Sequence, residues 1–541
     1  MAEPPHVVHL GQKSVGAFLI VLAFAVVVLA QPIGGAPIWE PNDARWVLLA
    51  RDMVEHGHWL MPDIRGVPNE GIYKPQLFAW CIALVSLPTG QVTEFTAAIP
   101  SIVSAIAGVL GVVAIGSLLW SIRAGVMAGL VLSTTPNYFV FAHHPLADVM
   151  MSAFMVWALY FVLRFRRDGA AGLLFGFYVC LGGAMLSKGP PGLAAVVAAA
   201  AATGLEGGRS VLRRMKPALG ALILLVLALP WLVPYLVAAR PAFVQEVLIG
   251  EYAQWFLGTH GIAYRIAHMP SALLYFLPWT LFLPAAVVWW RRSDRDDGRR
   301  YVLWWTLTLW VLVGLSGIYR ARYYLPVYPG LAILTGEFFA QATPRVVRRE
   351  IWLGCIAFAL VVVALLIALV FPPALSGEGP VFMPDTIWER AVVGGLLAVG
   401  AVGAVMVLMR HDTLVSLATL IAVVVGASFA IEGHTSAIRR ARHYDIRALG
   451  AVAIAHTSPN ATVFGYPDLS LEYDVYVRRN IVEIGPADLS ALLAKPSADV
   501  VIMTRRRWAA SAGQVAPGWR KTRREPSLQR PALMKSSRRR V

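Results

Sequence analysis

Long apolar runs alternate with short polar connections from the amino terminus to about residue 432. A run of about 20 apolar residues is enough to cross a ~30 Å hydrocarbon core as a helix. Thirteen runs approach or exceed that length, at 15–30, 99–122, 125–142, 147–163, 171–187, 190–205, 217–238, 271–290, 301–318, 323–341, 351–371, 391–409 and 413–431. A further run at 76–88 is too short to span and is expected to lie in the membrane interface. The pattern predicts an all-α polytopic membrane protein with about 13 transmembrane helices.

Composition and charge agree with this architecture. The chain is 57% hydrophobic and 14% charged, whereas soluble proteins carry roughly 25% charged residues. Lys and Arg are dense in the connections at 164–167, 209–216, 291–300 and 345–349. By the positive-inside rule, the alternate connections share the outer side, at 32–98, 143–148, 188–189, 239–270, 318–322 and 372–390. The formal charge of +16 therefore reflects membrane orientation, and we expect no nucleic-acid partner.

The character of the sequence changes after residue 432. Residues 461–504 hold four strand-like runs, A-T-V-F-G-Y, D-V-Y-V, N-I-V-E-I and D-V-V-I-M-T, and a short amphipathic stretch. They predict a small α/β domain, which the parity of the helices puts outside. Residues 505–541 contain twelve Lys or Arg against one acid and are expected to form a disordered tail. The predicted division is a membrane domain at 1–432, a soluble domain at 433–504 and a basic tail at 505–541.

The first outer loop, 32–98, is the longest polar interruption in the membrane domain. Its carboxylates, cations and histidines cannot stay in hydrocarbon, because they need water or protein partners. Asp43 and Arg45 open an amphipathic helix at 43–56, and Lys74 precedes the short interfacial run. One interpretation is structural, with Asp43 capping the helix and Lys74 reaching the lipid headgroups. The other is that both belong to an active site at the membrane surface.

Other polar groups occupy the same outer side. They are His144 and Asp148 in F-A-H-H-P-L-A-D (141–148), Lys188 in a tight turn, His260 and Arg265 in 251–268, and Arg322 and Tyr323 in 318–329. Each has a plain structural explanation, such as helix capping by Asp148 or interfacial placement of Lys188. The helix centres are almost free of the ionisable residues that transporters usually carry mid-membrane. The pattern favours an enzyme over the two alternatives, a transporter or flippase of a lipid-linked sugar and a non-catalytic receptor.

Several of these segments together resemble one family. W-E-P-N-D-A-R-W, R-D-M-V-E-H-G-H-W-L-M-P-D-I-R-G-V-P, Y-K-P-Q-L-F-A-W, L-S-K-G-P-P-G-L-A and R-Y-Y-L-P-V-Y-P-G-L-A-I-L are similar to segments of the GT-C lipid-linked glycosyltransferases. The match is to the aminoarabinose transferase (ArnT)-like branch of the protein O-mannosyltransferase superfamily, over about residues 10–435. The resemblance implies the GT-C fold with a periplasmic soluble domain, in the bacterial inner membrane.

The resemblance also implies a reaction, namely inverting transfer of a sugar from a polyprenyl-phosphate donor to an acceptor at the periplasmic face. The acceptor is left open between lipid A, another lipid, a glycan and a protein. The leaving phosphate must be neutralised, which suits Arg45, Lys74, Arg265 and Arg322, with Tyr323 as a hydrogen-bond donor. A hydroxyl acceptor needs a base, for which Asp43 and Asp148 are the candidates, whereas a phosphate acceptor needs none. We expect the enzyme to be a monomer in the bilayer.

The chain departs from the family at two places. The usual Asp-Glu pair of the first loop is Asn42-Asp43, so the role of the acid falls to Asp43 or Asp148. Tyr73 stands where the family commonly has Glu before Lys-Pro. In relatives that Glu and a His matching His260 can bind a divalent metal, so Tyr73 argues against a metal site, and no other cofactor is expected. The auxiliary site candidates are Asn42, Tyr73, His144, Lys188 and His260.

Overall fold

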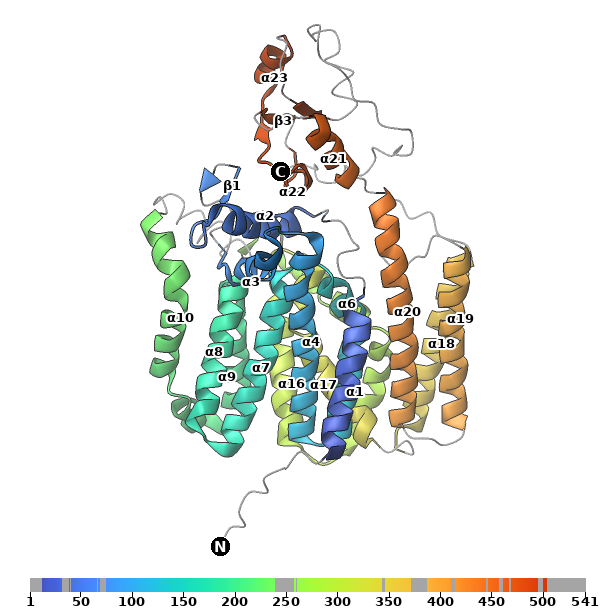
Figure 1. The fold of residues 1–541 in the computed structure, drawn as a ribbon. Coiled ribbons are helices and arrows are strands. Elements are labelled where there is room, and N and C mark those ends of the chain that lie inside the picture. The colour runs from blue at the N-terminus through green and yellow to red at the C-terminus, as the bar shows by residue number, and fades with distance from the viewer. Residues whose placement is uncertain are drawn as a thin grey trace.

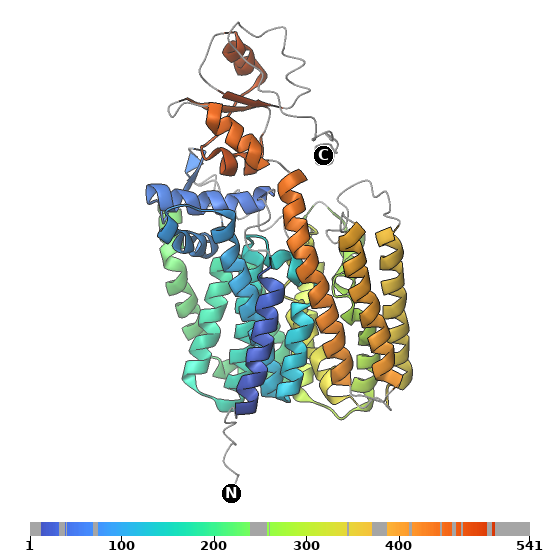
Figure 2. The same ribbon diagram turned by 45° about the vertical axis from the view of Figure 1, so that its right-hand side comes forward.

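The structure is a computed structural model in two visible parts. It describes residues 12–31, 38, 40–65, 67–68, 74–238, 257–258, 260–342, 346–370, 387–409, 414–443, 446–456, 461–466, 469–494 and 500–503. Tyr73 and the predicted tail at 505–541 lie outside these residues. A bundle of long helices carries a small domain above one end (Figure 1). Figure 2 shows α2, the blue helix, lying across the top of the bundle beneath that domain.

The helices of the membrane domain follow the predicted apolar runs. They are α1 (Gln12–Leu29), α4 (Glu94–Leu119), α5 (Ile122–Ser133), α6 (Pro136–Ala142), α7 (Ala147–Asp168), α8 (Ala171–Lys188), α9 (Ala194–Arg214), α10 (Pro217–Ala238), α13 (Ile262–His268), α14 (Ser271–Leu274), α15 (Leu283–Arg292), α16 (Asp297–Gly314), α17 (Tyr328–Gln341), α18 (Arg348–Val370), α19 (Ile387–Met409) and α20 (Leu414–His443). Short 3-10 helices join some of them, namely η2 (Pro190–Leu193), η4 (Trp279–Phe282) and η5 (Ala321–Tyr324). The predicted all-α membrane domain is confirmed.

Two of the predicted spans are bent, and the expectation of single continuous helices there is wrong. α5 and α6 divide the run 125–142 and differ in direction by 66°. Pro136 begins α6, and proline both lacks an N–H and disfavours a helical residue before it. The segments Ile262–Leu274 and Trp279–Arg292 likewise meet at 92°.

The described residues account for part of the predicted membrane spans. Among them, four helices are long and apolar enough to cross a membrane, or up to six if each bent pair forms one span. The total of about 13 spans remains a prediction.

The helices pack around one large apolar core. Trp279, Tyr138 and Tyr301 are among its largest fully buried side chains. α4 and α5 approach closely, because a Cβ on Gly116 would lie 2.8 Å from the Cα of Gly125. Small residues permit such contact between membrane helices. This packing holds the helix ends, and so the connections between them, in fixed positions.

The first outer loop folds onto one end of the bundle. It contains α2 (Pro41–His56), the antiparallel pair β1 (Asp63–Ile64) and β2 (Val67–Pro68), and α3 (Leu77–Ser86). α2 and α3 share a second apolar core, in which the rings of Trp46 and Phe78 meet edge-on with centroids 5.5 Å apart. α3 has 10 residues, which is too few to span a bilayer. The loop therefore rests on the membrane end rather than crossing it.

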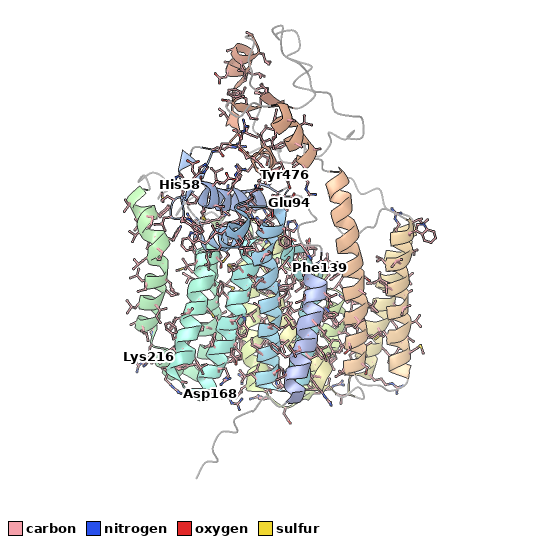
Figure 3. All side chains as sticks on the ribbon, in the orientation of Figure 1. His58, Glu94, Phe139, Asp168, Lys216 and Tyr476 are labelled. Atoms are coloured by element: carbon pink, nitrogen blue, oxygen red, sulfur yellow. The ribbon has the colours of Figure 1, made fainter. Side chains whose placement is uncertain are left out.

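The two ends of the bundle differ as the charge pattern predicts. Figure 3 places His58, Glu94 and Tyr476 at the end that carries the first outer loop. It places Asp168 and Lys216, which border the predicted inner connections, at the opposite end. The polar outer connections and the basic connections thus lie at different ends.

The soluble domain contains a three-stranded parallel sheet with strand order β4-β3-β5. Its elements are α21 (Ile446–His456), β3 (Val463–Tyr466), α22 (Glu472–Val477), β4 (Val482–Glu483), α23 (Pro486–Leu493) and β5 (Val500–Met503). The prediction of a strand at D-V-Y-V is wrong, because these residues lie in α22. The helix ends at Arg478 in the left-handed conformation (φ 56°), and the Asp474 side chain is held by distant residues that local sequence does not reveal.

The last long helix passes the predicted domain boundary at residue 432. α20 continues to His443 across that position. The division of the chain into domains remains a prediction.

Candidate active site

The turn between α6 and α7 carries two of the predicted site residues. Leu146 N donates to Ser101 Oγ on α4 at 3.0 Å, which holds the turn against the bundle. His144 lies in this turn, and Asp148 lies in the first turn of α7. No side-chain hydrogen bond caps α7, so helix capping does not account for Asp148.

Asp43 joins the first outer loop to this turn. It lies in the first turn of α2 and is 2% exposed. Its Oδ2 accepts a hydrogen bond from Nδ1 of His144 at 2.8 Å. α2, like α7, has no side-chain cap, so capping does not explain Asp43 either. A buried carboxylate is costly unless it is paired, and His144 supplies the partner.

Asp148 and Lys188 form a second buried pair. Asp148 is 3% exposed and is ion-paired with Lys188, the last residue of α8. Gly189 ends the helix with φ 88°, a conformation that glycine adopts readily. Lys188 Nζ also lies 4.3 Å from the ring centroid of Tyr323, which is within cation–π range.

η5 brings Arg322 and Tyr323 to the same place. Asn137 Nδ2 on α6 donates to Ala321 O at 2.9 Å, which anchors η5 to the bundle. The guanidinium carbon of Arg322 lies 5.9 Å from the ring centroid of Tyr323. Arg322 Nε is buried and has no hydrogen-bond partner among the described residues.

Arg322 interacts electrostatically with both buried pairs, Asp43–His144 and Asp148–Lys188, through their carboxylates. Burial tends to lower its pKa, but neighbouring groups outweigh burial and raise it overall. In order of effect these groups are Asp148, Tyr323, Asp43 and Glu40. Arg322 therefore stands in the field of both buried carboxylates. We call this arrangement the outer cluster; it consists of Asp43, His144, Asp148, Lys188, Arg322 and Tyr323.

His260 and Arg265 form a neighbouring group around the turn at 315–317. His260 Nδ1 hydrogen-bonds to Gly317 O at 3.3 Å. Arg265 donates to three backbone carbonyls, those of His260 at 3.2 Å, Leu315 at 2.9 Å and Leu257. Gly258 (φ 45°) passes so close to Gly317 that a Cβ on it would lie 2.5 Å from the Gly317 Cα. These contacts tie Arg265 to backbone, and its expected phosphate contact remains a prediction.

The remaining expected residues lie on the first outer loop. Asn42 and Arg45 are half-buried on α2, on either side of Asp43. Lys74 is half-buried and lies three residues before Leu77, the first residue of α3. Tyr73 lies outside the described residues. The roles assigned to these residues remain predictions.

Gln76 is a candidate that the sequence pattern did not single out. It is 0% exposed, and neither of its side-chain amide atoms has a hydrogen-bond partner among the described residues. Buried polar groups are normally hydrogen-bonded, so an orphaned amide two residues after Lys74 is compatible with a polar ligand. In sequence it looks like an ordinary polar residue at a helix start.

The described residues contain no group of three His, Cys, Asp or Glu side chains arranged to hold a metal ion. The family's metal pair would fall on His260 and position 73. A tyrosine at position 73 does not supply the expected carboxylate. The residues therefore do not fit that metal site.

The chain is similar to known membrane glycosyltransferases in sequence. Residues 73–233 match the family described as dolichyl-phosphate-mannose-protein mannosyltransferase. The undecaprenyl phosphate-alpha-4-amino-4-deoxy-L-arabinose arabinosyl transferase of Enterobacter sp. (strain 638) is 24% identical over 383 residues, 68% of this chain and 67% of that protein. The enzyme of the same description from Yersinia enterocolitica is 27% identical over 341 residues, 61% of this chain and 60% of that protein.

The folds agree as well. The crystal structure of ArnT from Cupriavidus metallidurans bound to undecaprenyl phosphate has a TM-score of 0.76 at 20% identity, covering 94% of this chain and 96% of that one. In the apo state the TM-score is 0.77. The fold is therefore the GT-C fold, and the protein is a membrane-embedded glycosyltransferase. In sequence and fold the chain is similar to ArnT enzymes, which confirms the resemblance carried by the sequence motifs and gives the flippase alternative no support.

Proposed function

We propose that this enzyme transfers a sugar from a polyprenyl-phosphate-linked donor to an acceptor at the periplasmic face of the bacterial inner membrane, with inversion of the anomeric centre. The similar arabinosyl transferases are named for an undecaprenyl phosphate donor, and the similar crystal structure holds undecaprenyl phosphate. The observation that carries the proposal is the outer cluster, in which Arg322 has a buried Nε without a described partner.

The charge change in the reaction explains why cations are needed. A polyprenyl-phosphate sugar is a phosphodiester with one negative charge, and its leaving group is a phosphate monoester that carries a second one. Preorganised cations and hydrogen-bond donors lower the barrier by stabilising this developing charge. Lys188 Nζ and the Arg322 guanidinium carbon lie 4.3 and 5.9 Å from the ring centroid of Tyr323, so two cations and a phenol are already assembled there.

Asp148 has a supporting part in this proposal. Its ion pair holds the Lys188 ammonium in place at the end of α8. A lysine on a flexible four-carbon stem gains most from such a restraint, because its charge is otherwise spread over many rotamers. We assign Arg45, Lys74 and Arg265 to the same donor headgroup, with Gln76 as a further polar contact.

Charge and position support the proposed periplasmic location of the site. The connections at 164–167 and 209–216 are basic, and Asp168 and Lys216 at their ends lie opposite the first outer loop, which contributes Asp43 to the outer cluster. Lipid-linked sugars must reach the site from the membrane, and the first outer loop covers the cluster at the bundle end. We propose that the monomer is the active unit.

Arg322→Ala tests the proposal. Removing one preorganised donor of this kind costs about 10²–10³-fold in kcat. We therefore expect a loss of that size when the purified protein, reconstituted in vesicles, is given labelled undecaprenyl-phosphate sugars and a membrane extract. Arg322→Lys should recover part of the activity, since it keeps the charge but not the fork of donors.

Arg164→Ala is the matched control for this experiment. Arg164 is paired with Asp168 at the inner end of α7 and is partly exposed. This variant should transfer sugar at the wild-type rate. Wild-type transfer by Arg322→Ala would instead contradict the phosphate-binding role of the outer cluster.

A further inference from the structure

The chemistry of the acceptor is the part of the reaction that the proposed function leaves open. A phosphate oxygen is already charged and can attack the anomeric carbon without losing a proton. A hydroxyl has to give up its proton as it attacks, so it needs a base within hydrogen-bond reach. Whether the outer cluster holds such a base therefore decides which class of acceptor it fits.

Asp148 is poorly placed to be that base. It is buried and ion-paired with Lys188, and its charge is one of those that act on Arg322. If Asp148 took up a proton, Lys188 would lose its counter-ion in a buried setting, which is strongly unfavourable. These contacts indicate that Asp148 stabilises the neighbouring cations and does not accept the proton of the acceptor.

Asp43 is arranged differently, because its partner is an imidazole. Nδ1 of His144 donates to Asp43 Oδ2 at 2.8 Å, and the two side chains are 17% and 3% exposed. A carboxylate bound at Nδ1 selects the tautomer whose lone pair is on Nε2. The same carboxylate stabilises the imidazolium that forms when Nε2 takes a proton. This is the geometry of an acid–base dyad.

The neighbouring histidine shows that the arrangement is specific to His144. His143 Nδ1 hydrogen-bonds to the carbonyl oxygen of Phe139 at 2.8 Å, and its ring packs on Phe139 with centroids 4.6 Å apart. His144 instead faces a carboxylate that is 101 residues away in sequence. Two adjacent histidines thus have different surroundings, and His143 provides a matched control.

We infer that His144 is the general base of the transfer, that Asp43 positions it, and that the acceptor atom is a hydroxyl oxygen. This inference rests on the proposed function and leaves its donor half unchanged. A bond forms between the acceptor oxygen and the anomeric carbon while the bond from that carbon to the donor phosphate oxygen breaks. The electron pair of the broken bond leaves with the phosphate, beside Lys188 and Arg322. The hydroxyl proton passes to Nε2 of His144.

His144→Asn is the decisive variant. The asparagine amide can donate to Asp43 much as Nδ1 does, so a purely structural bridge would survive, but it cannot take up a proton. In reconstituted full-length enzyme supplied with labelled undecaprenyl-phosphate sugars and native membrane extract, we expect kcat to fall about 10²–10⁴-fold, with KM for the donor unchanged. His143→Asn should keep the wild-type kcat.

Asp43→Asn tests the positioning role. Its amide can donate to Nδ1 and so favour the tautomer whose lone pair points away from the acceptor. We expect kcat to fall while KM for the donor stays the same, a separation that general loosening of the fold would not produce. The amount of folded protein, measured by gel filtration, should match wild type.

The linkage in the product gives an independent readout. A sugar joined to a hydroxyl is a glycoside that resists mild acid, whereas a sugar joined to phosphate is released by it. An acid-labile product, or wild-type kcat in His144→Asn, would overturn the dyad and leave the proposed function standing. If wild-type enzyme forms no labelled product from any donor in the panel, both fail together.

Discussion

Lys188 and Asp148 show how a single contact at the outer end serves both stability and the site. Lys188 ends α8, and Asp148 lies in the first turn of α7, so their ion pair joins two neighbouring helices. Breaking a buried pair by removing one partner leaves an uncompensated charge, which is more costly than removing both partners. The effects on folding and on catalysis can therefore be separated by mutation.

Lys188→Met leaves Asp148 buried and unpaired. We expect it to lower the free energy of unfolding by about 3–5 kcal/mol and to abolish transfer. The double variant Lys188→Met/Asp148→Leu should regain most of the stability and none of the activity. Thermal unfolding in detergent, followed by Trp fluorescence, measures the first effect. Equal midpoints for wild type and Lys188→Met would contradict this account of the pair.

At the scale of helices, the buried ion pair of Arg299 and Glu337 holds α16 against α17 at the end of the bundle opposite the outer cluster. Arg299 donates through Nε and Nη2 to Glu337 Oε1 at 2.8 and 2.6 Å, and Glu337 is 0% exposed. Arg299 also stacks on Trp289, with its guanidinium carbon 4.7 Å from the ring centroid. α16 and α17 carry η5 between their outer ends. The inner pair therefore contributes to the placement of Arg322 without touching the site.

Glu337→Ala should destabilise the bundle without changing the chemistry. We expect a loss of about 3–5 kcal/mol in unfolding free energy, because Arg299 is left buried and unpaired. Transfer measured well below the unfolding temperature should keep its kcat and KM. The exposed pair of Arg300 and Asp297, 3.8 Å apart, supplies the control, since Asp297→Ala removes only a solvated contact. An equal loss of unfolding free energy in Glu337→Ala and Asp297→Ala would contradict this prediction.

At the scale of the whole molecule, the soluble domain is bound to the first outer loop by buried polar contacts. Arg65, at the end of β1 with φ 60°, donates to both carboxylate oxygens of Asp474, which is 0% exposed. Burial lowers the pKa of Arg65, but Asp474 and Glu483 outweigh it and raise the pKa overall. Tyr476 adds a bond to Glu94 at 2.8 Å. Arg65 lies nine residues before Lys74 in the sequence, so these contacts bind the first outer loop to the soluble domain close in sequence to a proposed site residue.

Asp474→Ala should weaken the contact between the soluble domain and the first outer loop. We expect faster limited proteolysis between α20 and β3 and a fall in kcat/KM for the donor, because a buried Arg65 loses its main partner. Asp488→Ala is the control, since within the described part of the chain Asp488 accepts a hydrogen bond from Gly485 N at 3.3 Å, at the exposed start of α23. An intact proteolysis pattern together with wild-type kcat/KM in Asp474→Ala would show that the contact does not support the loop.

Local pattern alone could predict much of this architecture. Apolar length marks each helix of the bundle, because crossing hydrocarbon imposes a minimum number of residues. The density of Lys and Arg separates the ends, and motif resemblance indicates the enzyme class. Apolar length alone missed the bend at Pro136, because it does not register the local effect of a proline. Local pattern also failed at α22, which was expected to be a strand and whose Asp474 binds an arginine 409 residues away.

The amino-acid sequence by itself determined which residues collect on the outer side and what kinds of chemistry they could perform. Only the tertiary structure determines their partners: Asp43 pairs with His144, and Asp148 pairs with Lys188. The reason is physical: a side chain's type and membrane depth follow from its local sequence. Whether a buried carboxylate holds a cation or orients a base depends on which atom of another helix lies within 3 Å, as for any hydrogen bond.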